Sequence, residues 1–150
     1  MCFGSKQDTP GNFTYHPTCL GKEIMIGCIK LVHRSGQFAC RQKTLYNSNW
    51  GCGQLVAGWV NVVVTDYKKR LLWPKPRLTI LHPKYGKGLW HYVPGFHEDS
   101  PVLPMCDLAA PVCLSHGQTI HFWYGEDLTN VYEMDNIGTI CIDVYGFLVY

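Results

Sequence analysis

The chain has 150 residues, of which 47% are hydrophobic and 16% are charged, and its formal net charge at pH 7 is +2. This length suits one domain with its own core. The composition excludes a disordered chain, which needs few apolar and many charged groups. The few charges also exclude a long solvated helix or a coiled coil. We therefore expect residues 1–150 to form a single domain.

Strand-forming residues dominate the sequence, and the 15 Gly and 9 Pro are spread along the chain. Ile24 and Ile26 share one face of the first predicted strand, and Gly27 precedes a change of face, which predicts a β-bulge. Residues 54–65 are apolar on both faces, which predicts a central strand. We expect strands at residues 24–32, 38–45, 54–65, 71–73, 77–81, 119–124 and 139–150.

Seven short strands separated by turns predict an all-β fold, namely a disulfide-stabilised β-sandwich or jelly-roll-like domain. Residues 84–111 are rich in Gly, Pro and aromatic side chains, and we expect one long aromatic-rich loop there, or two. Loops of this length are usually functional or held by cross-links. The longest apolar stretch, residues 55–65, is too short to span a membrane and carries Asn61.

Eight cysteines without Cys-x-x-Cys spacing predict disulfides, and hence an oxidising, extracellular compartment. Buried free thiols are the alternative. Residues 1–6 lack the apolar run of a signal peptide, so secretion is inferred from cysteine use. Asn12, followed by Phe13 and Thr14, forms a glycosylation sequon. We expect Cys106 to bond Cys113. The predicted disulfide residues are Cys2, Cys19, Cys28, Cys40, Cys52, Cys106, Cys113 and Cys141.

The charges are divided unevenly along the chain. Residues 1–87 hold all 13 Lys and Arg and only three acids, whereas residues 88–150 hold eight acids and no Lys or Arg. Three interpretations remain open: the two parts interleave their charges, the acidic part holds a cation, or opposite patches steer a partner or drive self-association. Nucleic-acid binding is disfavoured, because residues 68–70 form the only basic run.

The acidic loop after residue 124 is a candidate calcium site. Carboxylates are concentrated between residues 126 and 143, and hard cations prefer such oxygen ligands. The pattern is not that of an EF-hand, and a solvated loop with a turn at residues 135–138 is the alternative. The candidate metal ligands are Glu126, Asp127, Asp135 and Asn136.

Aromatic side chains in the loop beginning at residue 84 are candidates for a binding surface, because such rings stack on sugars and anchor protein partners. The alternative is that they cap the ends of a sandwich. The candidate ligand-binding residues are Tyr85, Trp90, Tyr92 and His97. No nucleophile, base and orienting group can be named together, so we do not expect an enzyme.

Residues 139–146 read Thr-Ile-Cys-Ile-Asp-Val-Tyr-Gly. This segment resembles the last strand of discoidin-like and fucose-binding jelly-roll domains. The likeness covers about eight residues, the early motifs of those families are absent, and no binding residue is carried over. The resemblance implies a secreted β-sandwich binding module.

These patterns favour a secreted, non-enzymatic binding module for a glycan or protein ligand. It would be lectin-like, with the aromatic loop beside an acidic loop that Ca²⁺ orders. The first alternative is a structural or matrix protein that forms homo-oligomers through its opposite charges. The second is a secreted toxin, pigment or protease inhibitor, since disulfide-rich scaffolds serve all these roles.

Overall fold

The computed structural model describes residues 1–16, 23–41 and 46–150. The larger of its sheets has the strand order β1 (Cys2–Gly4), β12 (Asn136–Leu148), β3 (Glu23–Cys40) and β10 (Val112–Ser115). Strands β4 (Asn47–Ser48) and β9 (Val102–Cys106) also pair with β3. All these pairings are antiparallel.

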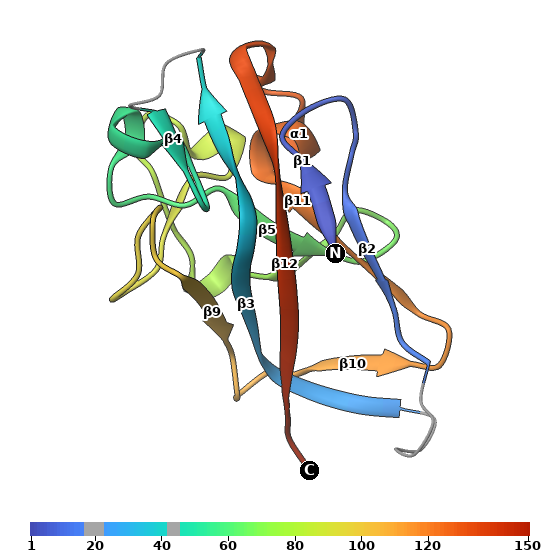
Figure 1. Cartoon of the computed structure of the whole chain (residues 1–150). Coiled ribbons are helices and arrows are strands. Elements are labelled where there is room, and N and C mark those ends of the chain that lie inside the picture. Colours follow the sequence, from blue (N-terminus) through green and yellow to red (C-terminus); the bar gives the residue numbers. More distant parts are fainter. Residues whose placement is uncertain (17–22, 42–45) are drawn as a thin grey trace.

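A second antiparallel sheet lies behind β3 and β12 (Figure 1). Its order is β2 (Gly11–Thr14), β11 (Thr119–Tyr124), β5 (Val62–Thr65) and β6 (Leu71–Trp73). A separate ribbon pairs β7 (Ile80–Leu81) with β8 (His91–Tyr92). The all-β prediction is confirmed.

The helical elements are all short. The one described α-helix is α1 (Gly125–Thr129), which directly follows β11. The described 3₁₀ turns are η2 (Gly53–Val56), η3 (Pro76–Leu78), η4 (Gly86–Gly88) and η5 (Glu133–Asp135). In the described ranges, no helix has the length and apolar character that crossing a membrane requires.

The core lies between the two sheets. Alternation along each strand sends every second side chain inward, so that Ile120, Phe122 and Tyr124 of β11 are buried, as predicted. Strand β5 is buried along its whole length and lies between β11 and β6, which confirms its central position. From the larger sheet, the buried side chains include Phe3, Ile29, Leu31, Phe38, Leu103, Leu114, Ile140 and Ile142.

Strand β3 pairs with β12 over most of its length, and this pairing contains two irregularities. Phe147 lies opposite Cys28 but Leu148 lies opposite Ile26, so Gly27 is the extra residue of a bulge. The predicted bulge is therefore confirmed. Figure 1 shows β3 bending as it runs from its pairing with β10 to its pairing with the first half of β12.

Five of the seven strand predictions were wrong in their bounds, and only those at residues 71–73 and 119–124 agree with the structure. Residues 24–32 and 38–40 belong to one continuous strand, and residues 42–45 lie outside the described part. Residues 53–56 form η2 instead of a strand, and the strand begins only at Val62. Residues 76–78 form η3, so only residues 80–81 of the predicted strand at 77–81 are extended, and the last strand covers residues 136–148 instead of 139–150. Residues 84–111, predicted as one long loop or two, contain η4, β8 and β9.

The structure pairs six cysteines as Cys2–Cys141, Cys28–Cys106 and Cys40–Cys52. The predicted Cys106–Cys113 bond was wrong, because the β3–β9 register places Cys106 opposite Cys28. Cys113 lies on β10 opposite Met25, is exposed, and has no disulfide partner in the described part of the chain. Cys19 lies outside the described residues.

Among the described residues, the basic and acidic parts of the chain meet in three ion pairs. These are Arg34 with Asp143, Arg41 with Asp135, and Arg77 with Asp107. Each joins a base from residues 1–87 to an acid from residues 88–150, which agrees with the interleaving interpretation of the charge split. Self-association through opposite patches stays a prediction.

Gly36 is a position in β3 where a side chain should be poorly tolerated. Its φ is +78°, and a Cβ there would meet the carbonyl oxygen of Thr139 on β12. We expect Gly36→Ala to lower the free energy of unfolding by about 2–4 kcal/mol, from left-handed strain and overpacking together. Gly117 is the control, because its φ is +79° but nothing lies within 4 Å. Gly117→Ala should cost about 1–2 kcal/mol. Equal losses in urea denaturation would contradict the packing argument.

Candidate functional site

A cavity of about 540 Å³ opens beside the C-terminal end of β3. This volume falls within the range of about 300–1,000 Å³ that is typical of small-ligand sites. Its walls come from the end of β3, from η2, from residues 85–90 and from residues 126–135. The charged and aromatic side chains of the lining are Arg41, Tyr85, Trp90, Glu126, Tyr132, Glu133 and Asp135.

Buried Asn61 fixes two of these walls relative to each other. Its Nδ2 donates to the Gly88 carbonyl oxygen at 2.6 Å, and its Oδ1 accepts from the Glu126 backbone N–H at 3.0 Å. The Asn61 carbonyl oxygen accepts from the Gly125 N–H at 2.6 Å. A Cβ on Gly125 would lie 2.7 Å from the Gly88 carbonyl oxygen, so the close approach of η4 and α1 requires glycine there.

A buried carboxylate forms part of the cavity wall. Glu126 is 4% exposed, and its two oxygens accept hydrogen bonds from Trp90 Nε1 at 2.7 Å and Asn136 Nδ2 at 2.8 Å. Burial raises the pKa of Glu126 to about 7, although both hydrogen bonds oppose the shift. The Oδ1 atom of Asn136 is buried, and no hydrogen-bond partner for it lies in the described ranges. Asn136 therefore has an unused acceptor beside a carboxyl group that titrates near neutrality.

The Cys40–Cys52 disulfide forms another part of the wall. Its sulfur atoms lie 3.3 and 3.2 Å from the hydroxyl of Tyr124. Burial raises the pKa of Tyr124 well above its usual value, with a further contribution from the charge of Glu126. The cross-link thus joins the end of β3 to the residue before η2 at the cavity, with a neutral phenol against it.

Two tyrosine rings stand at a right angle in the cavity. The ring centroids of Tyr85 and Tyr132 are 5.9 Å apart, and the planes are inclined by 88°. Tyr132 is 49% exposed, and Lys84 Nζ lies 5.1 Å from the centroid of the Tyr85 ring. The pair therefore offers apolar ring faces to a ligand while its hydroxyls supply polar atoms.

Glu133 is the least compensated carboxyl group of the site. Its Oε2 is buried and has no hydrogen-bond partner among the described residues. Burial raises the pKa of Glu133, and the charge of Asp127 and a hydrogen bond to it add to the shift. Asp127 itself is fully buried, and its oxygens accept the backbone N–H groups of Asp8 and Thr9 at 3.0 and 3.2 Å. Glu133 therefore contributes an uncompensated acceptor atom beneath the surface of the cavity.

The opposing positive charge is limited. Arg41 is the only basic side chain that lines the cavity in the described ranges, and it already pairs with Asp135 at 3.6 Å. Both side chains are at least half exposed. The cavity thus contains three carboxyl groups and one guanidinium group.

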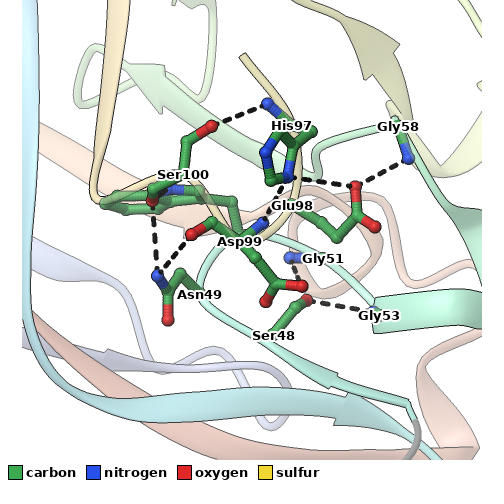
Figure 2. A network of polar contacts seen from close by, with 10 residues as sticks. Ser48, Asn49, Gly51, Gly53, Gly58, His97, Glu98, Asp99 and Ser100 are labelled. Carbon is green, nitrogen blue, oxygen red and sulfur yellow. Dashed lines mark hydrogen bonds and ion pairs between the residues drawn. The ribbon is translucent and has the colours of Figure 1, made fainter.

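A network of hydrogen bonds joins residues 48–58 to residues 97–100 (Figure 2). Glu98 Oε2 accepts from the Gly58 N–H at 2.6 Å, and Trp50 Nε1 donates to the Ser100 carbonyl oxygen at 2.6 Å. A Cβ on Gly51 would lie 3.0 Å from the Trp90 ring and 3.3 Å from the Glu98 Cβ. The network therefore fixes the backbone on which Trp90 packs.

Half of the predicted aromatic and histidine residues line the cavity. Tyr85 and the buried Trp90 do so. Tyr92 is 43% exposed on β8 and packs against Trp59, with ring centroids 6.0 Å apart. His97 is exposed and belongs to the supporting network, where its Nδ1 lies 3.9 Å from Glu98 Oε2.

The predicted metal ligands are also divided. Glu126 and Asp135 line the cavity, whereas Asn136 contacts Glu126 and Asp127 binds the turn at Asp8. Among residues 1–16, 23–41 and 46–150, no three His, Cys, Asp or Glu side chains form a group suited to a metal ion. Asn12, the predicted glycosylation residue, is exposed on β2, and its Oδ1 accepts from His121 Nδ1 at 2.6 Å.

Sequence analysis missed Arg41 and Tyr132. Tyr132 stands among the carboxylates of the predicted acidic loop, so an aromatic residue within an acidic segment was a usable signal. Arg41 carried no such signal, because the register of β3 and β12 brings it to Asp135.

Glu126 should make stability depend on pH. Because its pKa is about 7 in the folded chain and near 4.5 when unfolded, its stabilising effect is present below pH 4.5 and lost as pH rises through 7. We expect Glu126→Gln to gain about 2–3 kcal/mol of unfolding free energy relative to the wild type between pH 5 and pH 8. Urea denaturation at both pH values measures this. The exposed Glu23→Gln control should show no such gain. If the difference in unfolding free energy between Glu126→Gln and the wild type is the same at both pH values, the raised pKa of Glu126 is contradicted.

No family model matches the chain, and no significant match appears among curated proteins. The likeness of residues 139–146 to discoidin-like domains therefore has no support from a family match. Among solved structures, the chain is similar to AJLec from the sea anemone Anthopleura japonica, with a TM-score of 0.83 and 31% sequence identity. The match covers 99% of this chain and 92% of that chain. This chain therefore belongs to the same family as the sea anemone lectin AJLec and is a lectin-like binding module.

Proposed function

We propose that this protein is an extracellular carbohydrate-binding protein without catalytic activity, and that the cavity beside α1 is its sugar site. The observation that carries the proposal is the combination of perpendicular tyrosine rings with carboxyl groups in a cavity of about 540 Å³. Membership of a lectin family supports it. The three disulfides support an oxidising compartment.

The residues of the cavity suit the two kinds of surface that a sugar presents. The C–H face of a pyranose packs on Tyr85 or Tyr132 through apolar contact. Its hydroxyl groups donate to Asp135 at the exposed side of the cavity. Arg41 donates to a ring or hydroxyl oxygen. These contacts orient a ligand, and no bond-breaking step is part of the proposal.

Two further features belong to the proposal. We expect Asn12 to carry an N-linked glycan, because its side chain is exposed on β2. We also propose that Ca²⁺ assists binding. Of the predicted ligands, Glu126 and Asp127 have both carboxylate oxygens engaged in hydrogen bonds. Calcium would therefore depend on Asp135, with Glu133 as its neighbour on the same turn.

A glycan array tests the sugar site directly. We expect the wild type to bind a defined set of glycans, and Tyr132→Ala to weaken that binding at least tenfold, because truncating a central aromatic anchor commonly costs about 2 kcal/mol or more. Tyr67→Ala is the matched control, since Tyr67 is 65% exposed after β5, outside the cavity lining. Silence of the wild type on the array would contradict the proposed function.

Calcium is tested separately by thermal melting. A ligand that binds only the folded state raises the melting temperature, so added Ca²⁺ should stabilise the wild type and a chelator should reverse the effect. Asp135→Asn should abolish the stabilisation. Asp143→Asn is the control, because Asp143 also pairs with an arginine at the surface. If added Ca²⁺ leaves the melting temperature unchanged, calcium is removed from the proposal and the sugar site is unaffected.

A further inference from the structure

We propose that the free edge of β12 at residues 143–148 pairs with the same edge of a second copy of this chain, so that the protein forms a two-fold symmetric dimer with one continuous sheet. This edge lies outside the cavity lining, so the dimer does not depend on the proposed function. Three observations support the dimer: backbone groups without a partner, a register that the edge determines, and apolar side chains that meet in that register.

Strand β12 is covered by β3 on one edge but only in part on the other. Strand β1 pairs with residues 139–141 of β12, and Met1 and Ile142 exchange two further backbone hydrogen bonds of 2.8 and 2.7 Å. Beyond Ile142, no described residue pairs with this edge, although β12 continues to Leu148. Figure 1 accordingly shows β1 beside only the upper part of β12.

Strand geometry identifies the backbone groups that face this free edge. In an antiparallel strand, successive residues direct their N–H and C=O groups to alternate edges. Ile142 directs both groups to Met1, whereas Val149 donates its N–H to Met25 at the start of β3 at 2.9 Å. Such a row of unpaired groups is a template for another strand. The residues that face the free edge are therefore Val144, Gly146 and Leu148.

The free edge lacks the features that usually prevent strand pairing. Natural edge strands are commonly blocked by charged side chains, by Pro or by a bulge. Residues 144–148 read Val-Tyr-Gly-Phe-Leu and contain neither a charge nor a Pro. The two irregularities of the β3–β12 pairing place their extra residues, Gly27 and Arg34, on β3, so β12 itself stays regular. Gly146 is exposed, which leaves room for a partner strand.

The free edge determines one register for the second copy. All three facing residues are paired only if the two-fold axis passes Gly146, so that Val144 lies opposite Leu148 of the second copy. A shift toward the start of β12 would bring that Leu148 opposite Ile142, whose backbone groups are already bonded to Met1. A shift in the other direction leaves Val144 beyond the end of the partner strand, since β12 ends at Leu148.

The side chains that meet in this register are apolar on both faces of the sheet. On the outer face, Tyr145 lies opposite Phe147 of the second copy, and these side chains are 49% and 60% exposed in the single chain. Aromatic cross-strand pairs of this kind stabilise a sheet. On the inner face, Val144 and Leu148 already pack against the core. The dimer would therefore cover the two exposed aromatic residues of each copy.

The size of the contact predicts reversible association. Two copies of Tyr145 and Phe147, each about half exposed, would bury roughly 400 Å² of aromatic surface. The paired backbones add to this area, and the total stays at the low end for specific interfaces. The cavity lies near the start of β12, about 30 Å along the strand from Gly146. The dimer would thus carry its two cavities at opposite ends, and only their use in cross-linking glycans rests on the proposed function.

Sedimentation velocity of the full chain from about 1 µM to about 1 mM tests the assembly. We expect a monomer at low concentration and a dimer at high concentration. The dimer should persist in about 1 M NaCl as in about 0.1 M, because salt screens charge pairs but does not weaken apolar contacts. A monomer at every concentration would overturn the proposal. A dimer that dissociates in high salt would also overturn it, in favour of association through opposite charges.

Two substitutions at Gly146 form a matched pair. Gly146→Pro removes the central N–H of the free edge, where an outward N–H makes Pro tolerable in the single chain. It should weaken dimerisation at least about tenfold, because both copies lose a central hydrogen bond. Gly146→Ala keeps the N–H, and its Cβ would lie at an ordinary distance of 3.5 Å from Ile26, so this variant should still dimerise. A dimer that Gly146→Pro leaves unchanged would overturn the assignment to this edge.

Thermal melting shows whether both variants are folded. If Gly146→Pro fails to fold, Phe147→Lys replaces it, because a lysine on an edge strand opposes strand pairing and this side chain is 60% exposed. Phe147→Lys should also weaken the dimer at least about tenfold. Leu78→Lys is its control, since Leu78 is 56% exposed on η3. Equal dimerisation of the two lysine variants would overturn the proposal.

Discussion

The side chain of Asn61 is buried where β5 begins, and the geometry of the whole cavity depends on it. One amide bridges the Gly88 carbonyl oxygen and the Glu126 N–H, while the Asn61 backbone accepts from Gly125. A buried amide is costly unless its atoms are paired. The pairing therefore holds η4 and α1 at one separation. Trp90 and Glu126 then meet across this junction through a hydrogen bond of 2.7 Å.

The carboxyl groups near this junction differ in how hydrogen bonds compensate their charges. Both carboxylate oxygens of Asp127 accept hydrogen bonds from the backbone of the turn at Asp8, so N–H dipoles compensate its charge. Glu126 receives two side-chain donors and is still destabilised as an anion by burial. Glu133 has one buried oxygen to which no group in the described part of the chain donates. Such unpaired polar groups reduce stability.

Sequence patterns predicted those parts of the structure that depend on local periodicity. The alternation of Ile120, Phe122 and Tyr124 indicated β11, and Gly27 indicated the bulge of β3. The prediction of one strand over residues 54–65 was wrong because the apolar residues there have two different roles. Leu55 and Val56 lie in η2 and line the cavity, whereas Val62 to Val64 fill the core.

The site was partly predictable for the same reason. Tyr85 and Glu126 lie in segments whose composition stood out, an aromatic loop and an acidic one. Their proximity depends on Asn61, a polar residue inside an apolar run, which the sequence presents only as an irregularity. The prediction that Cys106 bonds Cys113 was wrong because strand register determines the partner of a cysteine. Register places Cys28 opposite it across β3 and β9, although Cys113 is nearer in the chain.

The similarity to AJLec covers almost the whole chain, and at 31% identity it establishes a shared scaffold. A scaffold does not by itself determine a ligand, because sites are built on loops that vary more than the sheets beneath them. In this chain Tyr85 and Tyr132 come from two such loops, and Glu133 follows Tyr132 directly. The sheets, the disulfides and Asn61 hold these loops in place. The choice of ligand therefore has to follow from the charge and the ring faces of these residues.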